Sequence, residues 1–552
     1  MMSFLSLLPM ALLFLAALGI LVLMQLRPGI GYAWLIGALG SLLAVGAAVF
    51  LRWRLPLQIT IQQWSPFPGL SSPPSFRLDA SSWPYVFGLA VLALAFILTD
   101  AARLETEARP LNWAAGLALA GLGILSVMSA NPITLVFTWT AVDLVEFLMV
   151  ISSSSGRRMG VQTVTAFSVR VMGTLLVILA ILLAQSQATD FVLTPIPSSL
   201  AVYMLLAAGL RLGVLPLNLP YTREVYAWRG LGNVMRMIGP ASSLVVLGRM
   251  PDQVVPASSK GVLLALTVLA ALYGAAMWLS AEDEISGRPY WAIALAAFAV
   301  SSSINGNPRA SIIWGTALIL SGSLLFFFSV RRRQIMYIPL LGMLGIAGLP
   351  YTPAAAGVLG LAGDRFQFFT LLFIAASVFL LWGYFRHIFR PRDELYRLER
   401  WVHVVYPAGL MALILAQWVI ALLGWNGSLT MGVWWESVAV AVIAAAGIVL
   451  AYSLRGFFAL ANAPDENASA AQRSVAATAR WVRTFLRRAG MVMGGILALN
   501  WLYRFIRWLY QGLQNVILLL TAMLEGEGGI LWALVILALI ISLILTGTGG
   551  TQ

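Results

Sequence analysis

The chain has 552 residues, of which 60% are apolar and only 10% are charged, and its formal net charge is +13. A soluble domain carries about 25% charged residues, so this composition excludes an ordinary soluble protein. An arginine excess in such a chain is typical of loops that contact lipid headgroups, so we expect lipid and no nucleic acid as a partner. Cysteine is absent, which excludes disulfides and thiolate-ligated clusters. We expect no cofactor, no metal and no catalytic residue.

Apolar segments recur from one end of the chain to the other. Each is close to the roughly 20 residues that a helical span requires, and backbone in lipid must satisfy its hydrogen bonds internally. We therefore predict an all-α polytopic membrane protein with about sixteen transmembrane helices. The segments lie near 4–26, 30–51, 84–102, 112–130, 132–152, 161–185, 199–219, 231–249, 261–281, 289–306, 310–329, 335–361, 366–386, 402–424, 432–453 and 529–547.

Two connections differ from the short loops between the other segments. Residues 52–83 are rich in proline, serine and β-forming residues, which predicts a short hairpin at the membrane surface. In residues 454–528, four arginines between 480 and 488 recur at helical spacing, and aromatic and basic residues alternate in 501–510. We interpret this stretch as an amphipathic lateral helix on the cytoplasmic face. The alternative is a short additional span at 489–503.

The loop arginines predict the orientation, because cytoplasmic loops carry the excess of positive charge. Most of them fall on one side if the N-terminus faces outside, and an even number of spans then puts the C-terminus outside as well. We expect the protein in the inner (cytoplasmic) membrane.

Ionisable residues inside predicted spans are expensive, and they are candidates for function. Asp143 and Glu146 share one face of their helix because they are three residues apart. Arg170, Arg211 and Arg236, on the next three segments, are the obvious partners. The five residues form either a charge cluster in an ion path or a static neutralised network that orients helices. The sequence alone leaves both interpretations open.

Prolines interrupt two of the predicted spans. Pro216 lies in the seventh span and Pro350 in the twelfth, and a proline inside a helix kinks or breaks it. Broken helices next to a membrane charge are frequent in transporters. Their spacing predicts two five-helix inverted repeats.

At these residues the chain resembles the antiporter-like membrane subunits of respiratory complex I, of multisubunit cation/proton antiporters and of membrane-bound hydrogenases. The resemblance covers nearly the whole chain and is greatest to the largest, distal complex I subunit. The motifs that carry it are Phe76-Arg77-Leu78-Asp79, Ser168 to Gly173, Ala207 to Asn218, Glu282-Asp283-Glu284 and Gly383 to Arg386.

The proton-path residues of that family are degenerate here. Arg211 replaces the family's lysine in the seventh span, and Asp143 is the best match for its carboxylate. Met235, Trp314, Leu318 and Gly322 occupy positions where the family has histidines or lysine. Because arginine stays protonated in proteins, Arg211 should hold a carboxylate without relaying protons.

The resemblance implies a subunit of a complex I-like assembly with other membrane subunits and redox partner subunits. We favour impaired or rerouted proton conduction with a scaffold role. A functional proton or cation pump subunit is the first alternative, and a stand-alone secondary transporter is the second. The expected parts are 1–111 (three helices and the hairpin), 112–249 and 250–390 (the repeats), 391–453 (two helices), 454–528 (the lateral helix) and 529–552 (the last span).

Overall fold

A computed structural model describes residues 2–460, apart from 27–31, 62–72, 104–108, 154–156, 188, 220–228, 330–332, 363–367, 391–399 and 425–428. The predicted lateral helix beyond residue 460, including Arg480, Arg483, Arg487 and Arg488, lies outside the described residues, as does the last predicted span. Contacts divide the chain into two units, Met1–Ala451 and Tyr452–Gln552. Everything that follows concerns the first unit, apart from the C-terminal end of α17, which extends beyond it.

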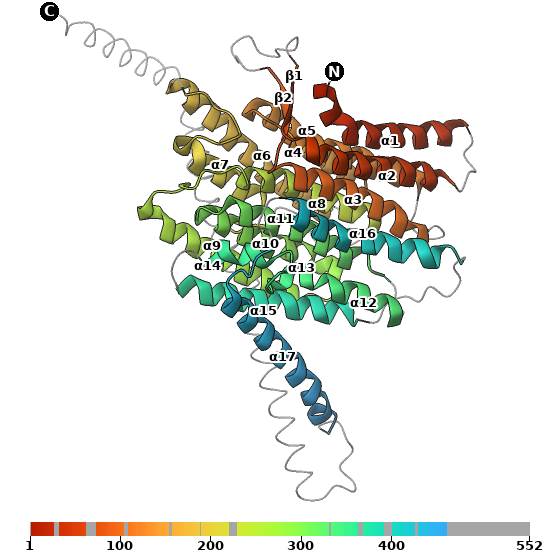
Figure 1. The fold of residues 1–552 in the computed structure, drawn as a ribbon, viewed down its shortest axis with the longest axis vertical. Helices are drawn as coiled ribbons and strands as arrows, with labels where there is room; N and C mark the ends of the chain where they lie inside the picture. The colour runs from red at the N-terminus through yellow and green to blue at the C-terminus, as the bar shows by residue number, and fades with distance from the viewer. Residues whose placement is uncertain are drawn as a thin grey trace, which may run out of the picture. The chain divides into compact units, whose positions relative to one another are not determined.

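Helices dominate the described residues of this unit (Figure 1). The first part of the chain contains η1 (Met2–Leu7), α1 (Leu8–Leu26), α2 (Ala33–Leu51), η2 (Arg52–Arg54), α3 (Trp83–Asp100), η3 (Ala101–Arg103), α4 (Pro110–Val127), α5 (Pro132–Ser153), α6 (Arg157–Ser186), α7 (Ser198–Arg211) and α8 (Arg229–Leu247). The second part contains α9 (Ala257–Ser280), α10 (Glu284–Ile304), α11 (Pro308–Phe327), α12 (Arg333–Gly342), α13 (Leu344–Ala347), α14 (Ala355–Ala362), α15 (Phe368–Ile388), α16 (Val402–Leu423) and α17 (Trp434–Leu460).

Eleven helices in the described residues are long and apolar enough to cross a membrane, and the apolar stretches Ser198–Arg211, Gln334–Ala347 and Trp434–Val449 are shorter. The expected all-helical, multi-pass membrane fold is therefore confirmed. The number of sixteen spans and the inverted repeat stay predictions. At its C-terminal end α17 continues to Leu460, past residue 453 where we expected that span to end.

Burial separates the central helices from the peripheral ones. Helices α3, α8 and α11 are buried along almost their whole length, and α8 packs against both α4 and α11. Helices α1, α2 and α6 expose large leucines, for example Leu15, Leu42 and Leu182. In a membrane such surfaces face the lipid tails, so the central helices form the interior where polar groups can be kept from lipid.

A two-stranded hairpin covers the loop between α4 and α5. Strands β1 (Leu57–Thr60) and β2 (Ser75–Leu78) pair antiparallel. The Arg77 amide donates to Met128 O (2.6 Å) and the Ala130 amide to Ser75 O (2.9 Å). The short strands predicted in residues 52–83 are therefore present, and β2 docks against the main helical body.

Both proline-interrupted segments lose their helical hydrogen bonding. Helix α7 ends at Arg211, and a series of turns carries the chain through Pro216. Asn218 Nδ2 donates to Leu210 O (3.3 Å) and to Pro216 O (2.9 Å), which satisfies carbonyls left over at the helix end. The second segment is divided into α12, α13 and α14. Gly348 directly follows the end of α13 and has a φ of 64°, a left-handed conformation that glycine adopts without strain. Pro350 follows in the gap before α14.

Candidate functional site

The two acidic residues of α5 lie next to each other on the buried face of that helix. Asp143 and Glu146 are each only 1% exposed, because their side of α5 faces α6 and α8 rather than the periphery. The spacing of three residues puts both carboxyl groups on one face, as predicted. Isolated charges at such depth would be very costly, so their stability depends on the cations supplied by the neighbouring helices.

Arg211 binds Asp143 in a two-pronged ion pair. Its Nη1 donates to Asp143 Oδ2 (2.5 Å) and its Nη2 to Asp143 Oδ1 (3.0 Å). The remaining donors are also used: Nη1 reaches Thr174 Oγ1 (3.2 Å), and Nε reaches Ser243 Oγ (3.2 Å). This planar fork is the geometry for which arginine, unlike lysine, is suited.

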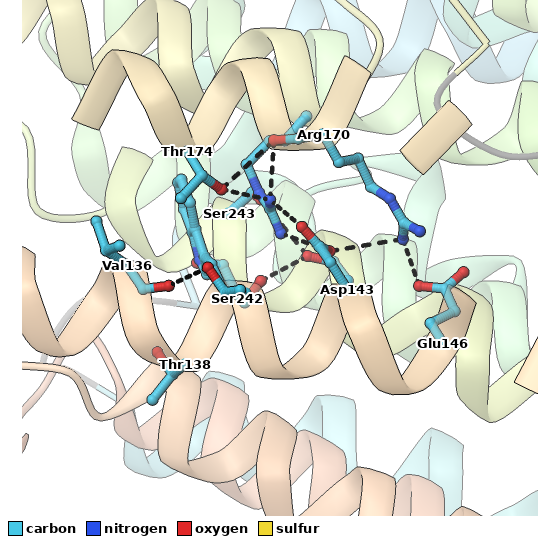
Figure 2. A network of polar contacts seen from close by, with 12 residues as sticks. Val136, Thr138, Asp143, Glu146, Arg170, Thr174, Ser242 and Ser243 are labelled. Atoms are coloured by element: carbon cyan, nitrogen blue, oxygen red, sulfur yellow. Dashed lines mark hydrogen bonds and ion pairs between the residues drawn. The ribbon is translucent and has the colours of Figure 1, made fainter. Parts of the chain in front are cut away.

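Glu146 binds two further arginines. Arg170 of α6 donates to Glu146 Oε2 through Nη1, and Arg236 of α8 donates to Glu146 Oε1 (2.8 Å). The same Arg170 Nη1 lies 3.7 Å from Asp143 Oδ1, so the two carboxyl groups share this cation (Figure 2). All five predicted residues are therefore brought together in one cluster from α5, α6, α7 and α8, which we call the charge cluster.

Packing holds the charge cluster in place. The Arg211 guanidinium lies over the Trp139 ring, 4.1 Å from its centroid, a cation–π contact. Gly173 allows α6 and α7 to approach closely, because a Cβ there would lie 2.5 Å from Arg211 Cγ and 3.0 Å from Ala207 O. The Trp139 indole donates to Ser242 O (3.2 Å). Arg211 thus has little freedom to change partners.

The composition of the charge cluster limits its chemistry. Three guanidinium groups face two carboxyl groups, and guanidinium does not release its proton in proteins. A lysine at position 211 could lose and regain a proton when buried, whereas Arg211 can only keep its charge. Among the described residues, no three His, Asp or Glu side chains come together that could hold a metal ion. The cluster can fix helices and an electrostatic field, but the arginines themselves cannot relay protons.

Aromatic rings fill the interior of the second part of the chain, where the family resemblance places titratable residues. Trp314 packs against Phe298 (centroids 5.0 Å apart), and Trp291 against Trp278 (5.3 Å). Two of the indoles donate to main-chain carbonyls near those positions: Trp314 Nε1 to Gly357 O (2.8 Å) and Trp291 Nε1 to Leu318 O (3.0 Å). These rings, with Phe326 and Tyr384, form what we call the aromatic core.

The position of Gly322 illustrates how tightly the aromatic core is packed. A Cβ at Gly322 would overlap Trp291 Nε1 and approach Phe326 Cε2 to 3.2 Å. Position 322 therefore accepts neither lysine nor histidine unless the indole moves.

Pro350 does not belong to the charge cluster. It lies between α13 and α14, in a part of the chain that contacts α11 and α15. A buried acid close to this break was missed in the sequence. Glu436, in the first turn of α17, is 4% exposed. It lies inside the segment 432–453, which the sequence predicts to cross the membrane. A single acid in such a segment is the sequence feature that could have pointed to this residue.

Ion pairs also lie at both ends of the helices in the first part of the chain. Near the hairpin, Arg249 Nη1 donates to Ser129 O (2.6 Å), and Arg249 Nη2 lies 3.7 Å from Asp79 Oδ2. Burial alone would raise the pKa of Asp79, but the Arg249 charge and hydrogen bonds from Ser81 and Ser82 hold it below its ordinary value. At the other end Asp100 pairs with Arg103 (2.9 Å). These pairs support a structural role, rather than a role in ion conduction, for the charged residues at the ends of these helices.

The described helices and the buried charge cluster define a class, polytopic membrane proteins with ionisable residues paired in their interior. No family model and no curated protein sequence matches the chain. Solved structures do match the chain in fold. A chain of the membrane-bound sulfane sulfur reductase, an archaeal respiratory membrane complex, matches over 97% of this chain and 99% of its own length, with 12% identity and a TM-score of 0.65.

Two further structures have the same fold. A chain of respiratory complex I from Thermus thermophilus with bound NADH matches over 81% of this chain and 98% of its own length (18% identity, TM-score 0.59). A chain of the Mrp complex from Dietzia sp. DQ12-45-1b matches over 88% of this chain (17% identity, TM-score 0.62), and this chain spans 60% of that one. The predicted antiporter-like fold is therefore confirmed, and the neighbours are chains of multisubunit membrane complexes.

Proposed function

We propose that this chain is an integral membrane subunit of a complex I-like assembly, with impaired or rerouted proton conduction and a scaffold role. The observation that carries the proposal is Arg211, which donates to four side chains or carbonyls and stacks on Trp139 within a fold typical of antiporter-like subunits. A cation fixed in this way orients α5, α6, α7 and α8 against one another. It does not load and release a proton.

The proposed partners are other membrane subunits, lipid and redox partner subunits. The mutual coverage of nearly the full length with a chain of an archaeal respiratory membrane complex supports assembly with such neighbours. Energy for any ion movement would come from those partners, since this chain has no cysteine to hold an iron–sulfur cluster. We further propose an inner-membrane location, with both termini outside and the predicted amphipathic helix on the cytoplasmic face.

The alternative function is a working proton or cation pump subunit. Glu436 favours it, because a buried acid in the second part of the chain could replace the titratable residues that α11 lacks. The second alternative, a stand-alone secondary transporter, would use the charge cluster and the two helix breaks as its substrate site.

Purification of the tagged chain from native membranes in mild detergent tests the proposal. We expect other antiporter-like subunits and an iron–sulfur or nickel protein to co-purify, identified by mass spectrometry. Recovery of the chain alone, or only with copies of itself, would overturn the subunit proposal and favour the transporter. A tagged, unrelated multi-pass protein from the same membranes is the control for non-specific recovery.

A further inference from the structure

A small cavity lies beside the break between α13 and α14. Its walls come from α11, α13, α14, α15 and α17, with Trp314, Ile346, Val358 and Phe373 among the apolar residues that line it. The cavity volume is about 20 Å³. This is enough for one water molecule, provided that polar groups are available to bind it.

Two polar side chains in the wall of this cavity have no partner among the described residues. Glu436 from α17 is 4% exposed and makes no hydrogen bond or ion pair with any residue that the structure describes. Thr370 from α15 is 1% exposed, and its hydroxyl is equally unpartnered within the described part of the chain. A fully buried hydroxyl is rarely left in this state, so Thr370 points to a bound molecule, and Glu436 lies in the same wall of the cavity.

Two serines complete the polar side of the cavity. The Ser377 hydroxyl donates to Phe373 O (2.9 Å) and the Ser437 hydroxyl to Val433 O (3.1 Å). Each hydroxyl oxygen retains a lone pair that can accept a further hydrogen bond. A water molecule in the cavity would thus find the two to four polar partners that a buried water requires.

We propose that Glu436 is a protonation site that exchanges its proton with a water molecule held in this cavity. Glu436 is the one titratable or charged residue among those that line the cavity, whether from α11, α13, α14, α15 or α17. An ionised carboxylate is very costly to bury without a cation, and no described residue that lines the cavity supplies one, so in this proposal the resting group is the neutral acid. When the acid O–H bond breaks, the proton moves to the water oxygen. The carboxylate is then stabilised by hydrogen bonds from the protonated water, which the Thr370 hydroxyl in turn binds.

The position of the site links it to the broken helix. Ile346 and Ala347, the last residues of α13, line the cavity. Gly432 lets the start of α17 approach closely, because a Cβ there would lie 2.6 Å from Ala355 O. Carbonyls freed at a helix end can bind water, so a hydrated route can begin here. The protonation site stands on its own, and only its use in rerouted conduction rests on the proposed function.

Infrared difference spectroscopy of the purified protein with its natural partners, reconstituted in liposomes, tests the site. A protonated buried carboxyl gives a C=O stretching band that is absent when the acid is ionised or replaced by an amide. We expect this band in the wild type, a shift on exchange into D₂O, and its loss in Glu436→Gln. Glu282→Gln, which removes an exposed acid, is the matched control and should leave the band unchanged.

A second variant keeps the inference testable if Glu436→Gln misfolds. Thr370→Val keeps the side-chain shape but removes a group that would hold the water, so the hydrogen bond from the acid to the water should weaken and the band should move to higher wavenumber. A wild-type spectrum that matches that of Glu436→Gln, or a band that D₂O does not shift, would overturn the proposal. So would a band that disappears on addition of NaCl, since it would assign the site to a metal cation. These readouts do not depend on which subunits co-purify. An unchanged proton flux in Glu436→Gln would contradict the use of the site in rerouted conduction, but it would not contradict the protonation site itself.

Discussion

The two parts of the chain fill their interiors with different kinds of side chain. In the first, α5 to α8 bury five ionisable side chains and neutralise them by direct pairing. In the second, α9 to α11 and α15 fill the interior mainly with aromatic rings whose polar atoms donate to backbone carbonyls, although they also bury Glu284, Arg288 and His387. Paired arginines and indole groups share one property: neither releases a proton near neutral pH. The two parts therefore differ in the interactions that hold their interiors together. A proton-exchanging group is proposed only at Glu436.

The largest expected effect comes from removing the central cation of the charge cluster. Arg211→Ala would leave Asp143 buried without its main partner, and breaking a buried pair costs about 3–5 kcal/mol. Arg211→Lys retains the positive charge and should preserve assembly. Thermal unfolding of the purified complexes measures both. Arg54→Ala, at an exposed arginine, is the control and should change the free energy of unfolding by less than about 0.5 kcal/mol. Equal heat stability of wild type and Arg211→Ala would contradict the ion-pair interpretation.

A pair of glycine substitutions compares the packing of the two interiors. Gly173→Ala forces a methyl group against Arg211 and the α7 backbone, and Gly322→Ala forces one against the Trp291 indole. Overpacking of this kind costs about 1–3 kcal/mol, and we expect both variants to lose that much in thermal unfolding. Gly46→Ala is the matched control, because its Cβ would meet nothing within 4 Å. It should raise stability by up to about 1 kcal/mol. A Gly173 variant as stable as the Gly46 variant would mean that α6 and α7 are not in close contact.

The sequence predicted the charge cluster better than the aromatic core. Asp143 and Glu146 have a spacing that requires a shared helix face, and arginines on three successive segments leave few other partners. Which arginine binds which carboxyl depends on helix rotation and on the close approach at Gly173, and neither is encoded locally. The break after α7 follows directly from Pro216. The all-helical fold could be predicted because its apolar segments have the length of a bilayer.

The aromatic core and the burial of Glu436 could not be predicted for a physical reason. Tryptophan is compatible with a lipid face, an interface or an interior, and only tertiary packing places Trp314 against Phe298. Glu436 directly follows Trp434 and Trp435 at the start of a predicted span, where a charge normally reaches the aqueous interface. Its burial results from contacts that α17 makes with the distant break at Gly348.

A double-mutant cycle sharpens the description of the aromatic core. Trp291→Phe removes the donor to Leu318 O, which should cost about 1 kcal/mol, and it also removes the atom that a methyl group at position 322 would strike. Gly322→Ala should therefore be less destabilising in the Trp291→Phe background. We expect a coupling free energy of about 0.5–3 kcal/mol from thermal unfolding of the four proteins. Strict additivity would show that Trp291 is not what limits position 322.

The smallest expected effect concerns the ion pair of Asp79 and Arg249 at the edge of the first part, outside helices α3 and α8. Arg249 and the hydrogen bonds from Ser81 and Ser82 hold the pKa of Asp79 below its ordinary value of 3.8. The folded state therefore releases this proton more readily than the unfolded state, and the stabilisation is present above the unfolded pKa and declines as pH falls below it.

Thermal unfolding as a function of pH tests this expectation. At neutral pH wild type should be more stable than Asp79→Asn, and the difference should shrink once the pH drops below about 4. Asp190→Asn, at an exposed acid, is the control and should follow the wild-type curve throughout. A difference in stability between wild type and Asp79→Asn that stays constant down to acid pH would contradict this expectation. It would show that the Asp79 charge does not stabilise the position of Arg249, which would then depend only on the hydrogen bonds from Arg249 to backbone carbonyls.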